Sequence, residues 1–114
     1  MSECLFCRIV AGEIPADLVA EGADWVAFRD INPQAPTHVL IVPRRHIATL
    51  DDLTASDAPL MGSLVAAAAG IARDEGVVEG GYRLTANCGA GAGQSVFHIH
   101  LHLLGGRRFS WPPG

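Results

Sequence analysis

The stretch that decides the fold is SVFHIHLHLL, residues 95–104, in which histidine recurs at every second position. Successive side chains of a β-strand point to opposite faces of a sheet. In a strand, His98, His100 and His102 would therefore share one face. The other face would be apolar and would consist of Phe97, Ile99, Leu101 and Leu103. We predict a strand that turns its branched and aromatic residues toward the core and its imidazoles toward a different environment.

The composition of the chain fits one compact domain. It has 114 residues, of which 49% are hydrophobic and 18% charged, which is enough apolar material for a core and too little charge for a disordered chain. The net charge is −4, with eight Lys and Arg against twelve Asp and Glu. This balance argues against a general DNA or RNA binder. We predict a single domain over residues 1–114 with no nucleic-acid partner.

The chain carries no sign of export or of a membrane anchor. The N-terminal stretch MSECLFCRIV lacks the basic and long apolar regions of a secretory signal. The most apolar segment, residues 60–72, is too short to span a bilayer and is followed by charged residues. Three cysteines without an export signal favour a reducing compartment. We expect a cytoplasmic protein with no membrane partner.

Residue periodicity predicts an α+β fold. The expected strands are residues 17–21, 25–30, 37–43, 81–88 and 95–104. A short helix is expected to end at Gly12, and a long one is expected to begin near Ser56 or Asp57 and to end at Gly76. The apolar stripe of the long helix consists of Leu60, Met61, Leu64, Val65, Ala68, Ile71 and Ala72. These elements predict a mainly antiparallel sheet of about five strands with both helices packed on one side.

A glycine-rich loop precedes the histidines. GAGAGQS, residues 89–95, lets backbone N–H groups turn inward, and concave arrays of such donors bind anions. The loop lacks GK[ST] and leads into a strand, so it is not a P-loop. Beside a row of imidazoles, with Gln94 and Ser95 at the junction, it predicts a phosphate site. Imidazole is both a nucleophile and a proton carrier near neutral pH, so phosphoryl chemistry here needs no metal.

Several separated motifs resemble one family. HIHLHLL fits the pattern His-φ-His-φ-His-φ-φ of the histidine triad superfamily, where φ is apolar. LFCRIVAGEIPA, AFRDINPQAPTHVLIVPRRHI, GAGQSVFHIHLHLLGGR and WPPG are similar to segments of its nucleotide-binding branch, over nearly the whole chain. The resemblance implies a homodimer that hydrolyses purine nucleoside phosphoramidates or mixed nucleotide anhydrides. It also implies a covalent nucleotidyl-histidine intermediate and AMP as a product.

The resemblance assigns roles to residues of this sequence. His100 corresponds to the nucleophile, His102 and His38 to supporting histidines, and Ser95 to a hydroxyl near the leaving group. The residues implied to bind the nucleotide are Phe6, Ile9, Phe28, Asp30, Ile31, Asn87, Gly93, Gln94, Ser95, His100, His102 and Trp111. The apolar members form the base pocket, and Asp30 accepts hydrogen bonds from the ribose. Trp111 corresponds to an aromatic residue that approaches the site of the partner subunit.

The N-terminus carries half of a possible zinc site. Cys4 and Cys7 form a C-x-x-C pair, which is typical of tetrahedral zinc. Zinc-carrying relatives complete the site with residues that correspond to His46 and His98. The resemblance therefore implies a structural zinc that joins the N-terminus to the sheet, with no cofactor required for catalysis. The alternative is a pair of reduced thiols.

Three other functions fit parts of the pattern. A His-x-His pair on a strand also suits the metal centre of a zinc hydrolase, although no nearby acid follows the triad to complete it. A dinucleoside polyphosphate hydrolase shares the triad, but the WPPG tail and the GQS junction are more similar to the phosphoramidase branch. A nucleotide-binding sensor or scaffold with incidental turnover would use the same pocket.

Overall fold

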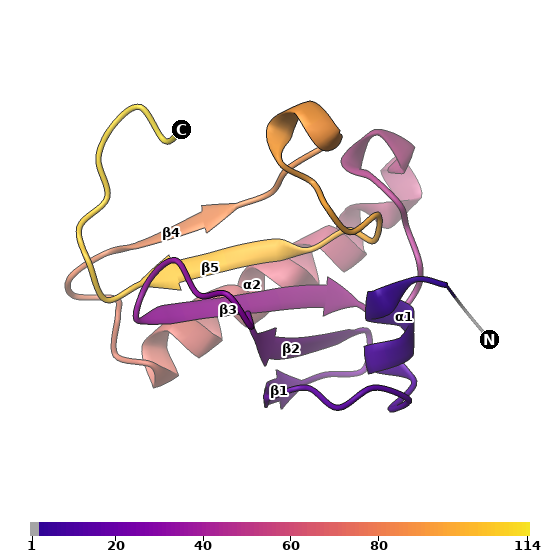
Figure 1. Ribbon diagram of the computed structural model, residues 1–114, viewed down its shortest axis with the longest axis horizontal. Coiled ribbons are helices and arrows are strands. Elements are labelled where there is room, and N and C mark those ends of the chain that lie inside the picture. The colour runs from indigo at the N-terminus through magenta and orange to yellow at the C-terminus, as the bar shows by residue number, and fades with distance from the viewer. Residues whose placement is uncertain (1–2) are drawn as a thin grey trace.

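A computed structural model of the protein, which describes residues 3–114, shows the predicted five-stranded antiparallel sheet (Figure 1). The strands lie in the order β1-β2-β3-β5-β4. They are β1 (Leu18–Glu21), β2 (Trp25–Arg29), β3 (Thr37–Pro43), β4 (Tyr82–Thr85) and β5 (Leu101–Gly105). The helices are α1 (Leu5–Val10) and α2 (Ala58–Asp74), with short 3-10 turns at Leu50–Asp52, Ala55–Asp57 and Ala90–Ala92. The α+β class predicted from the sequence is confirmed.

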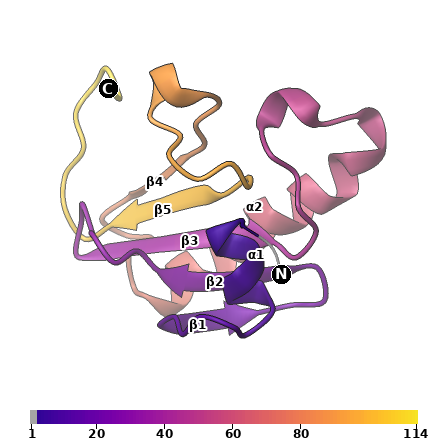
Figure 2. The same ribbon diagram turned by 45° about the vertical axis from the view of Figure 1, so that its right-hand side comes forward.

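The two helices cover opposite faces of the sheet, which corrects the expectation that both pack on one side (Figure 2). Residues of α2 share a core cluster with Val39 and Ile41 of β3. Phe6 of α1 belongs to a second cluster with Leu40 and Val42. β3 is buried along its whole length because it is central and both of its faces are covered. An unbroken apolar run such as VLIV is typical of a strand covered on both sides.

The long helix begins and ends where the sequence predicts. It follows Asp57 at its N-cap, and Gly76 just beyond it has φ +72°, a left-handed conformation that favours glycine. Its buried face is narrower than predicted and consists of Leu64, Ala68, Ile71 and Ala72. Val65 is 50% exposed because it lies about 100° around the helix from Leu64.

The helical stretch 55–74 is, by length and composition alone, long and apolar enough to cross a membrane. The expectation that this region is too short to do so holds for residues 60–72 but not for the longer helical segment. In the structure, Leu64 and Ala68 pack against the sheet in the main core cluster. This packing accounts for the apolar side chains of the inner helix face.

The histidine segment is only partly a strand. β5 begins at Leu101, and residues 95–100 have no regular structure, which corrects the predicted strand 95–104. β4 likewise ends at Thr85 rather than at residue 88. The segment before β5 is bonded to a neighbouring loop instead: the N–H of Ile99 donates to the carbonyl of Ile47 at 2.7 Å. Phe97 is 47% exposed and lies outside the core, contrary to the prediction.

The alternation of side chains nevertheless survives in this irregular stretch. Ile99, Leu101 and Leu103 enter the core cluster beneath α2. The rings of His98 and His100 lie against Phe6 of α1, on the opposite face. The sheet therefore presents its histidines on the side that α1 partly covers.

Candidate active site

Four histidines lie together on the α1 side of the sheet. His38 comes from β3 and His102 from the neighbouring β5, and their ring nitrogens Nε2 and Nδ1 are 2.9 Å apart. His100 lies beside His102, with ring centroids 4.9 Å apart. His98, two residues before His100, is fully buried. The structure thus brings together the three histidines predicted to act on phosphate.

Backbone groups fix which nitrogen of His38 and His102 carries the proton. The backbone N–H of Gln34 donates to Nδ1 of His38 at 3.0 Å, so this nitrogen is an acceptor. In neutral imidazole the other nitrogen is then the donor. We therefore assign Nε2–H of His38 as the donor to Nδ1 of His102, which leaves the proton of His102 on Nε2.

The tautomer of His100 leaves a free lone pair. Its Nδ1 lies 2.8 Å from the backbone carbonyl oxygen of His98. A carbonyl oxygen only accepts, so Nδ1 of His100 must donate its proton there. Nε2 is then the unprotonated nitrogen of the neutral ring. This is the arrangement that a nucleophilic imidazole requires.

Burial keeps the supporting histidines neutral. The pKa of His102 is lowered to about 4, mainly by burial and also by the charges of His100 and His38, against an opposing effect of Asp30. Burial also lowers the pKa of His38, again opposed by Asp30, whose Oδ2 is 3.5 Å from Nε2 of His38. Both rings are therefore neutral at pH 7, which preserves the directed hydrogen bonds described above.

An aromatic cluster lies beside the histidines. Phe6 of α1 and Phe28 of β2 meet edge to face with centroids 5.5 Å apart, and both are buried. The ring of Phe6 also lies 5.0 Å from that of His100, and Ile9 packs against the same cluster. Ile31, by contrast, is fully exposed and does not belong to this cluster. Three of the four apolar residues predicted for the base pocket are thus assembled.

The glycine-rich loop contains a short 3-10 turn, Ala90–Ala92. Gly93, at its C-terminal end, has φ +94°, and the side-chain nitrogen of Asn87 lies beside it. Gln94 is buried, and its carboxamide accepts from the N–H of Gly89 at 2.8 Å and donates to the carbonyl of Ala48 at 2.8 Å. This side chain holds the loop in place, a role that the sequence did not reveal.

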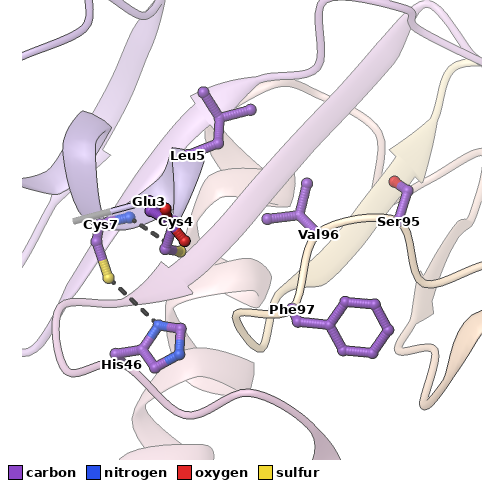
Figure 3. A pocket seen from close by; sticks show the side chains of 8 residues that line it. All are labelled: Glu3, Cys4, Leu5, Cys7, His46, Ser95, Val96 and Phe97. Atoms are coloured by element: carbon purple, nitrogen blue, oxygen red, sulfur yellow. Dashed lines mark hydrogen bonds between the residues drawn. The ribbon is translucent and has the colours of Figure 1, made fainter.

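The other predicted residues lie in three places. Ser95 is exposed and lines a cleft of about 610 Å³ beside the start of α1 (Figure 3). Asp30 follows β2, and its Oδ1 accepts the N–H of Asn32 at 2.8 Å, which leaves Oδ2 facing His38. Trp111, in the C-terminal tail, is 83% exposed.

The four residues predicted to bind metal form one cluster. Nε2 of His98 lies 2.8 Å from the carbonyl oxygen of Pro43, so it donates there and leaves the lone pair on Nδ1. That Nδ1 lies 3.4 and 3.5 Å from the sulfurs of Cys4 and Cys7, and 3.2 Å from Nδ1 of His46. The edges of a zinc tetrahedron with such ligands are roughly 3.3–3.6 Å. The residues therefore fit a zinc ion.

A second group, Asp30, His38 and His102, is equally close together, with potential ligand atoms within 4.8 Å of one another. Its hydrogen bonds differ, however. Because His38 accepts from Gln34 at Nδ1, its Nε2 carries a proton and has no lone pair for a metal. The group is thus a directed hydrogen-bond chain, and this argues against the zinc hydrolase alternative.

The fold and the histidine-lined site define a class of small α+β protein with a triad of alternating histidines on one sheet face. The model of the HIT domain family matches residues 11–109. The chain belongs to the HIT domain family.

Relatives and solved structures agree with this assignment. The purine nucleoside phosphoramidase of Escherichia coli K12 is 49% identical over 105 residues, covering 92% of this chain and 88% of that protein. An uncharacterised HIT-like protein of Synechococcus elongatus is 49% identical over the full length of both chains. A HIT family hydrolase from Legionella pneumophila Philadelphia 1 has a TM-score of 0.96 and 54% identity, covering 98% of this chain and all of that one.

Proposed function

We propose that the protein is a hydrolase of purine nucleoside phosphoramidates that releases AMP through a nucleotide covalently bound to His100. The observation that carries this proposal is the free Nε2 lone pair of His100, which follows from the bond between its Nδ1 and the carbonyl of His98. The relative from Escherichia coli named purine nucleoside phosphoramidase supports the substrate class.

The first chemical step forms the covalent intermediate. Nε2 of His100 attacks phosphorus, and the bond from phosphorus to the leaving nitrogen breaks with its electron pair. The departing amine takes up a proton that solvent water supplies through the hydroxyl of Ser95, which lines the adjoining cleft, and the second step returns a proton to solvent. The Nε2–H of His102, directed by His38, donates to a phosphoryl oxygen and stabilises the charge that develops there.

The second step releases the product. Water attacks the same phosphorus, the bond to Nε2 of His100 breaks, and the proton of the water leaves through the same hydrogen-bonded groups. Each step is an in-line displacement that inverts the configuration at phosphorus. Two inversions give overall retention of configuration. The same sequence of steps hydrolyses a mixed anhydride, with an acid in place of the amine.

The nucleoside is held beside this centre. Phe6, Ile9 and Phe28 pack against the base. Asp30 accepts the ribose hydroxyls, and Asn87 and Gly93 lie on the phosphate side. Gln94 acts mainly by holding the loop.

Three further features belong to the proposal. A zinc ion bound by Cys4, Cys7, His46 and His98 joins α1 to the sheet and takes no part in the chemical steps. The protein forms a homodimer in which Trp111 of each chain approaches the site of the other. It works in the cytoplasm, where the thiols stay reduced.

The test is the variant His100→Asn, assayed with an adenosine phosphoramidate. We expect turnover to fall by about 10³-fold or more, because the nucleophile is lost. The AMP dissociation constant should stay within a few-fold of that of the wild type. A variant that keeps most of its turnover refutes the covalent mechanism. Retention of configuration at a chiral phosphorothioate analogue, measured on the wild type, provides an independent check.

Two controls address the alternatives. Chelator treatment should leave turnover measurable in protein that remains folded by circular dichroism, whereas a zinc hydrolase would lose it. A dinucleoside polyphosphate should be a poorer substrate than the phosphoramidate by kcat/KM. The opposite order would favour the dinucleoside polyphosphate hydrolase.

A further inference from the structure

The turn that follows β5 packs against the loop between β2 and β3. This loop, residues 30–36, leads into Thr37, the first residue of β3, which is paired with Gly105, the last residue of β5. Both segments therefore lie at the same end of the sheet (Figure 1). The approach is close, because a Cβ on Gly106 would lie 2.9 Å from Cβ of Pro36. A side chain just after β5 is thus within reach of the loop.

Arg107 is the side chain that makes this connection. Its Nε–H donates to the backbone carbonyl of Gln34 at 2.9 Å. The same guanidinium lies over the ring of Phe109, 4.3 Å from the ring centroid, and its Nη1 donates to the carbonyl of Arg108 at 2.9 Å. Although the side chain of Arg107 is exposed, these three contacts hold its guanidinium in one orientation. The donor to Gln34 is therefore in place before any ligand binds.

Gln34 is also the residue that directs His38. Its carbonyl accepts from Arg107, and its N–H donates to Nδ1 of His38 at 3.0 Å. The side chain of Gln34 bonds only within the loop, to the carbonyl of Asn32 at 3.0 Å. A residue has only two soft backbone dihedral angles, so a bond on each side of its Cα leaves Gln34 little freedom to turn. Loss of the bond from Arg107 would free this backbone, and the N–H would then meet His38 for a smaller part of the time.

The proton between His38 and His102 matters for the proposed chemistry. Nε2 of His38 and Nδ1 of His102 share one hydrogen bond, and in neutral rings either nitrogen can carry its proton. The N–H of Gln34 places that proton on His38. With the proton on Nδ1 of His102 instead, Nε2 of His102 would be an acceptor and would lose its bond to a phosphoryl oxygen. Oδ2 of Asp30 lies 3.5 Å from Nε2 of His38, which is too long for a strong hydrogen bond that could replace this control.

We propose that Arg107 is a positioning residue for the reaction: through Gln34 it keeps His38 in the tautomer that makes His102 a donor to phosphate. The inference rests on the proposed function. Arg107 itself contacts neither the substrate nor the reacting atoms, and its effect passes through one backbone residue. A single hydrogen bond changes an equilibrium between two tautomers by about 2- to 10-fold, and the effect on kcat should be of this size.

The first measurement reads the tautomer directly and needs no turnover. The nitrogen NMR resonances of an imidazole distinguish a protonated ring nitrogen from one that carries a lone pair. At neutral pH and without substrate, His38 of the wild type should have its lone pair on Nδ1. In Arg107→Ala, both nitrogens of His38 should move toward the intermediate shifts of a mixture of tautomers. Arg107→Lys, which keeps a donor, should restore part of the wild-type pattern. Identical His38 resonances in the wild type and Arg107→Ala overturn the proposal.

Kinetics with an adenosine phosphoramidate test whether the effect reaches the chemistry. In Arg107→Ala, kcat should fall by about 2- to 10-fold, whereas the AMP dissociation constant should stay within about twofold of that of the wild type. In the background of His38→Asn, the same change should have no further effect on kcat, because the residue through which Arg107 acts is gone. An unchanged kcat, or an equal fold-loss in both backgrounds, overturns the proposal. A wild type without turnover refutes the proposed function, and the tautomer measurement then decides the role of Arg107 alone.

Two neighbouring arginines supply matched controls. Arg108→Ala removes the same charge but keeps the backbone carbonyl that accepts from Arg107. Arg83→Ala removes the other guanidinium near Phe109, which lies 5.2 Å from the ring centroid and donates to the carbonyl of Ser110. Both variants should leave the resonances of His38 as in the wild type. A change in either as large as in Arg107→Ala would indicate a general effect of charge or of the C-terminal tail, and it would overturn the proposal.

Discussion

Removal of one thiol from the Cys4, Cys7, His46 and His98 cluster should affect both stability and nucleotide binding. The four donor atoms lie at the spacing of a zinc tetrahedron. Because Nε2 of His98 donates to the carbonyl of Pro43, the lone pair of its Nδ1 is available to a metal at the centre of the cluster. A ligand present at 100–1,000 times its dissociation constant stabilises the folded state by about 2.7–4.1 kcal/mol. For a domain of this size, that energy corresponds to a shift in Tm of roughly 10–15 °C.

The same free energy of metal binding decides whether α1 stays packed against the sheet. The helix has six residues, and Phe6 is its one buried side chain. Burial of such a side chain contributes about 1.5–3 kcal/mol, which is no more than the metal supplies. Without the metal, α1 should therefore loosen and Phe6 should leave Phe28 and His100. AMP affinity should then fall by roughly 5-fold or more, and by linkage AMP should tighten zinc binding by the same factor.

The assay compares Cys7→Ser with Cys88→Ser, a matched change at an exposed cysteine outside the cluster. Thermal unfolding and AMP titration are measured on zinc-loaded protein and after chelation. Cys7→Ser should lower Tm by about 10 °C or more and should remove the response to chelator. Cys88→Ser should behave like the wild type. Identical melting of the two variants, or a wild type insensitive to both zinc and chelator, would refute the reasoning.

Four further predictions concern single residues. The pKa of His102 is lowered to about 4 from an ordinary value near 6.5, so the unfolded chain binds a proton in this window that the folded chain does not. Stability should thus be full above pH 6.5 and fall as the pH drops toward 4, and urea unfolding of His102→Gln should show a weaker dependence. Gly105→Ala should destabilise the fold by about 1–3 kcal/mol, because its Cβ would lie 2.7 Å from Cβ of Val77. A Cβ at Gly62 would meet no atom within 4 Å, so Gly62→Ala should instead stabilise α2 by up to about 1 kcal/mol. Chemical unfolding curves of the two glycine variants that match the wild-type curve would contradict both predictions. Asp30→Asn should raise the KM of an adenosine phosphoramidate about tenfold, because a charged acceptor for the ribose is lost. It should have little effect on the 2′,3′-dideoxy analogue, and an equal effect on both substrates would exclude the ribose contact.

Local patterns predicted much of the fold because they act through neighbouring residues. Strands β1, β2 and β3 follow from periodicity, and the ends of α2 follow from Asp57 and Gly76. The predictions failed where distant segments decide. Gln94 and Ile99 bond to the loop at Ala48 and Ile47, and the segment between them does not extend β5; no local pattern indicates this.

The sequence by itself determined that alternate histidines would share one face, since that depends only on the direction of successive side chains. It also placed two cysteines one helical turn apart at the start of α1. The tertiary structure alone decided which ring nitrogen of His38, His98 and His100 carries the proton. The carbonyls of Pro43 and His98 and the N–H of Gln34 make that choice. Backbone groups are the same in every residue except proline, which lacks the N–H, so only the fold reveals which of them meets an imidazole.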